Sequence, residues 1–227
     1  MSTVLCVWEL GGNLGHLSNL RLPIEMALAS GKQVVLAARQ LHRVREVLGD
    51  MPVTYLQAPF KHNAVPIGAG QLLSYTHLLA NQCFSSSDEL GAYLRAWRAL
   101  YRLVQPDVVL FEHSPTALIA ASDQAFKKVL VGTGFSVPTA QAEPGAPFLP
   151  FPTTPLTSAT RAALLQADRQ LLACIDLGLQ SVGAPPLGSL QRIYDQADAT
   201  LLMTWPQMDH FGESPGQPYI GIEAPAR

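Results

Sequence analysis

Basic residues are scarce in this chain, and they form no run. Its 15 lysines and arginines are outnumbered by 17 aspartates and glutamates, which gives a formal net charge of −2. Proteins that bind nucleic acids neutralise phosphates with clustered lysine and arginine side chains. We therefore expect no nucleic-acid partner.

Long apolar runs are missing as well. A membrane-spanning helix needs about 20 consecutive apolar residues, and no segment approaches that length. The apolar segment Thr3–Trp8 is short, has no basic segment before it and is followed by Glu9, so it does not have the pattern of a signal peptide. We expect a soluble, cytoplasmic protein without a membrane span.

Cysteine is rare, and its spacing excludes a common kind of metal site. The three cysteines, Cys6, Cys83 and Cys174, are far apart, and no Cys-x-x-Cys or Cys/His ligand spacing is present. A structural zinc site needs such clustered ligands. Cys6 lies in an apolar run and Cys174 on an apolar helical stripe, so we expect both to be small core residues. We expect no metal.

Apolar residues make up 48% of the 227 residues, enough for one sizeable core in one domain. They occur in short runs that alternate with helical patterns. The expected strands are 3–8, 33–38, 53–56, 107–111, 128–131, 200–203 and 219–222. The expected helices are 17–28, 41–48, 72–84, 88–104, 116–125, 157–180 and 190–197. This alternation indicates an α/β fold: a Rossmann-like, doubly wound, mainly parallel sheet with helices on both faces.

Two predicted loops are unusually long, 59–70 and 134–155. Loops of more than about 12–15 residues are uncommon in compact domains unless they bind something. Both follow predicted strands, which places them at the carboxyl edge of the sheet, where open α/β folds bind ligands. We expect these loops to border a binding site.

A glycine-rich turn, with Gly11, Gly12, Asn13 and Gly15, separates the first strand from the first helix. Backbone N–H groups beside a helix N-terminus favour a phosphate. The dinucleotide pattern Gly-x-Gly-x-x-Gly is incomplete, because Leu10 stands at its first glycine, and the P-loop pattern is absent. The second strand is followed by Arg39 rather than by an acidic residue. An NADP-binding oxidoreductase therefore stays open as an alternative.

His16 directly follows this turn, at the expected helix start and at the ligand edge. A neutral imidazole can take a proton from a hydroxyl group near neutral pH. Such a base needs a group that orients it, usually a carboxylate. Glu112 follows the fourth predicted strand at the same edge, so the two side chains come within reach if the first and fourth strands are neighbours. His113 is an alternative for this orienting role.

Several stretches together resemble the N-terminal half of inverting GT-B glycosyltransferases, the macrolide-type and plant-type enzymes that use nucleotide-diphosphate sugars. Those enzymes begin with a strand, a glycine turn that ends in Gly-His, a proline-containing helix and a second strand. The resemblance covers nearly the whole chain. The matching stretches are 4–8, 11–16, 20–23, 31–37, 106–112, 199–203, Pro206, Asp209 and 218–221.

The resemblance implies that His16 is the general base and that Glu112, which replaces the usual aspartate, is its orienting acid. It also implies a donor-phosphate loop formed by Gly11, Gly12, Asn13 and Gly15. Residues 1–222 would form the acceptor-binding domain, and residues 223–227 would begin a linker or tail. The nucleotide-sugar domain is absent from this chain, so we expect no turnover from the chain alone. Apart from the nucleotide-diphosphate sugar as co-substrate, no cofactor is implied.

Aromatic side chains in the long loops and in the helix after the first of them suggest a mostly apolar pocket for a small-molecule or lipid acceptor. Two alternatives stay open, the NADP-binding oxidoreductase and a non-catalytic half-domain that binds a ligand or a partner. Self-association into a homo-oligomer is also open. The residues expected to bind the acceptor are Phe60, Tyr75, Phe84, His113, Phe135 and Phe148.

Overall fold

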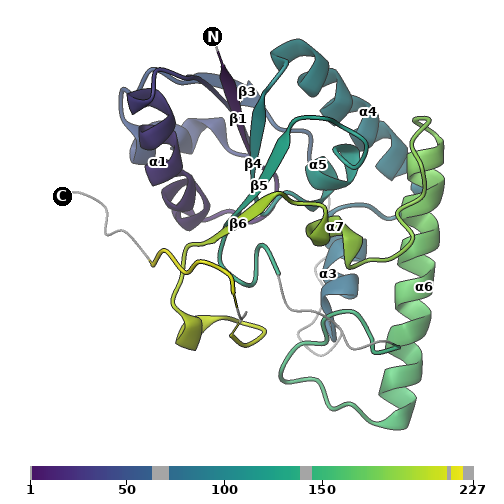
Figure 1. Ribbon diagram of the computed structural model, residues 1–227. Helices are drawn as coiled ribbons and strands as arrows, with labels where there is room; N and C mark the ends of the chain where they lie inside the picture. The colour runs from purple at the N-terminus through teal and green to yellow at the C-terminus, as the bar shows by residue number, and fades with distance from the viewer. Residues whose placement is uncertain (1, 63–71, 139–144, 214–215, 222–227) are drawn as a thin grey trace.

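The computed structural model describes residues 2–62, 72–138, 145–213 and 216–221. Its centre is a six-stranded sheet in the order β3-β2-β1-β4-β5-β6, and all five strand pairings are parallel (Figure 1). The strands are β1 (Thr3–Trp8), β2 (Gln33–Ala38), β3 (Thr54–Gln57), β4 (Val108–Glu112), β5 (Lys127–Gly132) and β6 (Ala199–Leu202). This is the strand order of a doubly wound Rossmann-like sheet, so the predicted fold class is confirmed.

Helices cover the two faces of the sheet, with α1 on one side and α4 to α7 on the other (Figure 1). The α-helices are α1 (Leu14–Ala29), α2 (Val44–Leu48), α3 (Tyr75–Gln82), α4 (Ser87–Val104), α5 (Pro115–Ala120), α6 (Ser158–Gln180) and α7 (Arg192–Asp195). Two short 3₁₀ helices, η1 (Leu41–Arg43) and η3 (Pro206–Met208), complete the described elements.

The alternation of side chains along β1 divides the core into two layers. Leu5 and Val7 belong to the larger cluster, which α4, α5 and α6 cover. Val4, Cys6 and Trp8 belong to the smaller cluster, which α1 and α2 cover. Successive side chains of a strand point to opposite faces, and a parallel sheet needs both faces covered, so a strand that is apolar throughout is the expected pattern. Cys6 is a buried core residue, as predicted.

Most predicted elements are found within a few residues, and the differences have tertiary causes. The helix predicted from residue 72 begins only at Tyr75, because Ser74 forms a bridge with Pro150 and Leu73 accepts a hydrogen bond from the Phe151 backbone. The helix predicted over 116–125 is α5, which ends at Ala120. The predicted helix 190–197 is likewise shortened to α7, and the predicted strand 219–222 is reduced, among its described residues, to one bridge between Leu202 and Tyr219.

Of the two long predicted loops, most of 59–70 and the segment 139–144 lie outside the described residues, as does the predicted domain boundary at residue 222. The described part of the second loop follows β5 at the carboxyl edge of the sheet. No helix within the described ranges is both long enough and apolar enough to cross a bilayer.

Candidate active site

The topology brings together the ends of β1 and β4. These two strands are neighbours, and their last residues, Trp8 and Glu112, are paired in register. The chain leaves β1 toward β2 on one side, whereas β4 lies on the other side, so this edge is the switch point where open α/β sheets bind ligands. Helix α1 begins just beyond β1 and carries His16 in its first turn.

His16 and Glu112 are in direct contact. The His16 Nδ1 atom lies 2.8 Å from Glu112 Oε2 and 3.0 Å from Oε1. The Glu112 side chain is fully buried, whereas 19% of the His16 side chain is exposed. A carboxylate that accepts from Nδ1–H fixes the tautomer and leaves Nε2 as the nitrogen that can accept a proton. The structure therefore forms the pair that we expected from the two strand ends.

Three neighbours hold the His16 ring in place. The Trp8 ring stacks on it with the ring centres 5.6 Å apart, and the centre of the His113 ring lies 5.4 Å away. Gly11 lies against the edge of the imidazole, and a Cβ atom at this position would stand only 1.9 Å from Nε2. Gly11 also has a φ of +79°, which L side chains rarely adopt. The turn therefore needs this glycine for its backbone and for the histidine.

The other members of the predicted phosphate loop, Gly12, Asn13 and Gly15, are exposed at the N-terminus of α1. Asn13 occupies the N-cap position but makes no side-chain capping bond, and the first turn of α1 contains no acidic residue. Unsatisfied N–H groups and the positive end of a helix dipole favour an anion. The exposed turn thus has the electrostatic character for a phosphate.

Glu112 has two further partners that the sequence did not reveal. Asn19 donates to Oε1 at 3.2 Å, and the Ser136 hydroxyl also interacts with the carboxylate. Burial raises the pKa of Glu112, while His16, Asn19 and Ser136 each lower it. Asn19 lies three residues after His16 and so on the same side of α1, which is a signal that could have been read. Ser136 lies in the long loop after β5 and gave no such signal.

A cavity of about 410 Å³ opens beside this pair. Volumes of this size are typical of small-molecule sites. Its wall includes His16 and Glu112, and Phe135 is the one residue of the predicted acceptor set among its lining residues. The remaining lining residues are Asn13, Gly15, Ser18, Asn19, Thr133, Ser136 and Met203.

His113 follows Glu112 but does not orient His16, because Glu112 occupies Nδ1. Its backbone has a φ of 41°, which is unusual for a residue other than glycine. Neither ring nitrogen has a hydrogen-bond partner among the described residues. Burial lowers the pKa of His113 to about 3, and the charges of His16 and Arg39 act in the same direction. The ring is therefore neutral and lies between His16 and Phe135.

The aromatic residues predicted to bind an acceptor do not share one pocket, and two of these predictions need correction. Tyr75 and Phe84 are core residues, with 0% and 1% of their surface exposed. Four aromatic rings surround Tyr75. Neither residue has surface left for an acceptor in this structure. Phe60 lies elsewhere, with the Arg39 guanidinium 4.4 Å above its ring centre.

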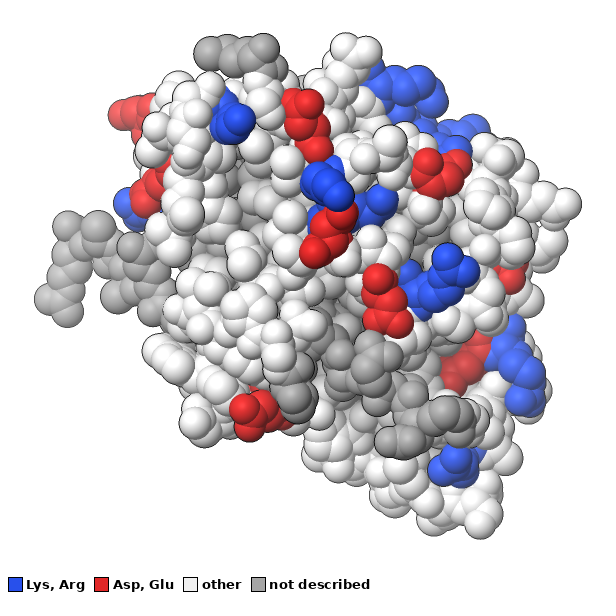
Figure 2. Space-filling model, viewed as in Figure 1, with Lys and Arg blue, Asp and Glu red and all other residues white. Residues whose placement is uncertain are grey.

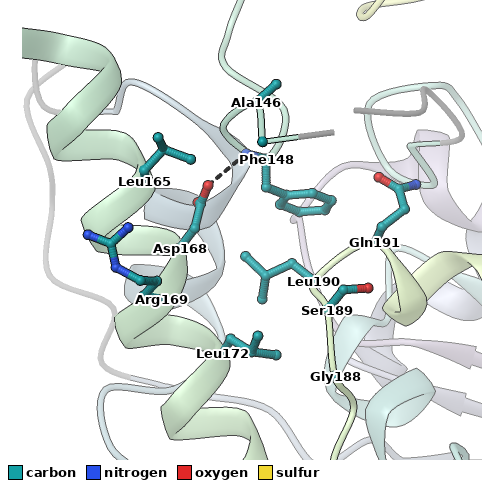
Figure 3. Close-up of a pocket in the computed structure, with 11 residues that line it drawn as sticks. Ala146, Phe148, Leu165, Asp168, Arg169, Leu172, Gly188, Ser189, Leu190 and Gln191 are labelled. Atoms are coloured by element: carbon teal, nitrogen blue, oxygen red, sulfur yellow. Dashed lines mark hydrogen bonds between the residues drawn. The ribbon is translucent and has the colours of Figure 1, made fainter. Parts of the chain in front are cut away.

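Phe148 lines a second cavity, of about 330 Å³, between α6 and the segments around residues 145–148 and 188–191 (Figure 3). The Asp168 carboxylate in its wall accepts from the Phe148 backbone N–H at 2.7 Å and from the Thr76 hydroxyl. Burial raises the pKa of Asp168, and these two donors lower it. Asp168 thereby joins α6 to α3 and to the loop before α6.

Arg39 is the residue for which NADP binding stayed an alternative, and its side chain contacts other parts of the fold. Its guanidinium donates to the Glu9 carbonyl at 2.9 Å and lies over Phe60. The guanidinium is therefore already used in contacts within the chain and is not free to bind the 2′-phosphate of NADP. Within the described residues, no group of three or more His, Cys, Asp or Glu side chains could hold a metal ion. On the face in Figure 2, basic and acidic side chains lie intermixed.

The chain matches no protein-family model and no curated protein. Solved structures do match its fold. The glycosyltransferase VinC in complex with dTDP has 14% identity and a TM-score of 0.54 over 96% of this chain and 52% of its own. The spinosyn rhamnosyltransferase SpnG, complexed with thymidine diphosphate, has 16% identity and a TM-score of 0.55 over 96% and 48%. The kitacinnamycin glycotransferase has 15% identity and a TM-score of 0.59 over 99% and 52%.

At these identities the similarity is one of fold. The chain spans about half the length of the matched structures. Its fold is that of one half of a GT-B glycosyltransferase, and it is consistent with the N-terminal half of that fold.

Proposed function

We propose that this chain is the acceptor-binding half of a glycosyltransferase that moves a sugar from a nucleotide-diphosphate sugar to a hydroxyl group, with inversion. The observation that carries the proposal is the contact between His16 Nδ1 and the buried Glu112 carboxylate in the wall of a cavity at the switch point. The fold shared with glycosyltransferases supports the same reaction class.

The proposed reaction is a single displacement. An acceptor hydroxyl in the cavity donates a hydrogen bond to His16 Nε2. As its oxygen forms a bond to the anomeric carbon of the sugar, the bond from that carbon to the diphosphate breaks, and the nucleotide diphosphate leaves with the electron pair. His16 takes the hydroxyl proton, and the Glu112 carboxylate stabilises the resulting imidazolium. Attack on the face opposite the leaving group inverts the anomeric centre.

The cavity suggests the class of acceptor. Phe135 and Met203 offer apolar surface, whereas Thr133 and Ser136 offer hydroxyl groups. An apolar wall with few polar anchors is typical of small-molecule sites. We propose a mostly apolar small molecule or lipid as the acceptor. His113, with its neutral ring between His16 and Phe135, is the further predicted acceptor residue that lies close to this cavity.

For the donor, we propose that the exposed turn of Gly11, Gly12, Asn13 and Gly15 faces the diphosphate. It lies at the positive end of the α1 dipole, beside His16. A turn of this size cannot by itself bind a nucleotide, and the matched glycosyltransferases are about twice as long as this chain. We therefore expect a second half to supply most of the donor site and the chain alone to show no turnover.

The test is His16→Ala in the enzyme that combines this chain with a donor-binding half. Release of nucleotide diphosphate would be measured with UDP- and dTDP-sugars and a panel of apolar alcohols and phenols. Turnover should fall by roughly 10²–10⁴-fold, the usual contribution of general acid–base catalysis, with little change in acceptor affinity. His42→Ala is the matched control, because His42 is exposed on η1, away from the cavity. A folded His16→Ala enzyme with near-normal turnover would rule out the proposal.

A further inference from the structure

Glu9 is a buried carboxylate that the proposed reaction does not use. It directly follows β1, and 1% of its surface is exposed. Its Oε1 accepts from the Thr116 backbone N–H at 2.7 Å, and its Oε2 accepts from the Ala117 N–H at 3.2 Å. Both donors belong to the first turn of α5, whose N–H groups have no partner within the helix. Glu9 therefore caps α5 from another strand.

The sequence already provides a residue that could cap α5 locally, but the side chain of that residue makes a different hydrogen bond. Ser114 occupies the N-cap position of α5, and serine is a favoured residue there. Its side chain makes no capping bond to the helix, and instead donates to the Glu112 carbonyl at 2.9 Å. Capping alone therefore does not require a buried acid, which is costly to remove from water. Because Glu9 accepts the first N–H groups of α5, the Ser114 hydroxyl can instead bind the carbonyl of Glu112, the residue that contacts His16.

The segment that contains Glu9 also contacts the His16 site directly. The Leu10 backbone N–H donates to the His113 carbonyl at 3.1 Å, which fixes the turn between β4 and α5. In that turn His113 has a φ of 41°, and its ring lies against His16. Trp8, the residue before Glu9, stacks on the same imidazole. One short segment thus bounds the histidine and holds the turn that carries Glu112 and His113.

We propose that Glu9 is a positioning residue: its ionised carboxylate fixes the start of α5 and so sets the Glu112–Ser114 turn against His16. The inference rests on the proposed function only in treating His16 as the group to be positioned. Two carboxylate oxygens can accept both N–H groups. A protonated acid or an amide keeps one good acceptor oxygen, which leaves one donor poorly satisfied.

Burial raises the pKa of Glu9 to about 7, whereas the Thr116 and Ala117 N–H groups and the Thr116 and Trp97 side chains lower it. The ionisation that controls the cap therefore falls near neutral pH. The other titratable groups that interact with the charge of Glu9 are Arg39 after β2, Tyr75 and Cys83 of the α3 region, Tyr93 and Tyr101 of α4, and Tyr194 of α7.

The test is NMR of the 227-residue chain, comparing wild type with Glu9→Gln and with Glu25→Gln. Glu25 is the matched control, because it is partly exposed on α1 and pairs with Arg21. At pH 8 we expect the His16 Nδ1–H signal to be shifted downfield by Glu112 in the wild type and in the control. In Glu9→Gln it should weaken and the His113 ring signals should shift. A folded Glu9→Gln chain with both sets of signals unchanged would overturn the proposal and leave Glu9 as a plain cap.

A second measurement covers the case in which Glu9→Gln does not fold. The pKa of His113 is about 3, so its ring stays neutral between pH 5 and pH 9 and reports movement of the turn. In a His16→Ala, Glu112→Gln background, where neither of these two side chains can contribute a titration, the His113 signals should still show an inflection near pH 7 from Glu9. A flat curve would refute the positioning role. Neither measurement needs turnover, so failure of the proposed transferase reaction would be recognised separately.

Discussion

Replacing Gly11 by alanine would place a methyl group where the His16 imidazole lies. The added Cβ would stand 1.9 Å from Nε2, whereas ordinary contacts begin at 3.4 Å. The ring would have to retreat by the difference, 3.4 − 1.9 = 1.5 Å. A movement of that size is incompatible with keeping the 2.8 Å contact between Nδ1 and Glu112. Two costs should add: about 1–2 kcal/mol for the left-handed backbone of a non-glycine residue and about 1–3 kcal/mol for overpacking.

A double-mutant cycle separates these two costs. Urea unfolding of the 227-residue chain would be followed for wild type, Gly11→Ala, His16→Ala and the double variant. Without the imidazole the new methyl group has room, so Gly11→Ala should then cost only the backbone strain, and the coupling energy should be about 1–3 kcal/mol. Gly15→Ala is the control, because nothing lies within 4 Å of its added Cβ. In a helix this change should be neutral or stabilising by up to about 1 kcal/mol.

The result that would refute this reasoning is an equal loss of stability from Gly11→Ala with and without His16. It would mean that the backbone alone requires the glycine and that the ring adapts freely. In the complete enzyme the same substitution should lower turnover by roughly 10²-fold, the effect of misplacing a catalytic group by about 1 Å.

Two further predictions concern Glu112 and His113. Glu112→Gln should lower turnover less than His16→Ala, and the two losses should not multiply, since the pair acts as a unit. Steady-state kinetics of the single and double variants would check this. Losses that multiply in the double variant would mean that the two residues act separately. Burial lowers the pKa of His113 from 6.5 to about 3, so its contribution to stability is present above pH 6.5 and is lost as the pH falls toward 3. His113→Phe should flatten this acid loss in urea unfolding between pH 7 and pH 4, and an unchanged slope would contradict the assignment.

The fold could be predicted because its signals are local. Each strand is a short apolar run, each main helix has a periodic apolar face, and their alternation permits few topologies. The contact between His16 and Glu112 followed from the same reasoning, because parallel strands end at one edge and both residues lie at strand ends. The predicted start of the helix at Thr157 is also local in origin, because the Thr157 side chain occupies the N-cap of α6 and accepts a hydrogen bond from the Thr160 N–H.

What the sequence could not reveal depends on contacts between distant segments. The direction of an aromatic side chain in or near a loop has no periodic signal, so Tyr75 and Phe84 were assigned to a pocket although the fold buries them. Ser136 reaches Glu112 only through the path of the chain after β5. Glu9 interrupts an apolar segment in the sequence, and its partners lie more than a hundred residues away, at the start of α5.

The same distant contacts explain how a glutamate can stand where the resembled family has an aspartate. The longer side chain needs room at the edge of the sheet, and Gly132 of β5 provides it, because a Cβ there would stand 3.2 Å from Glu112 Oε1. The extra rotatable bond also needs restraint, which Asn19 supplies by a hydrogen bond to Oε1, and Ser136 also interacts with the carboxylate. The long acid, a glycine on the neighbouring strand, Asn19 and Ser136 together place the carboxylate at Nδ1. Glu112 is therefore one member of a set of residues that fit together around His16.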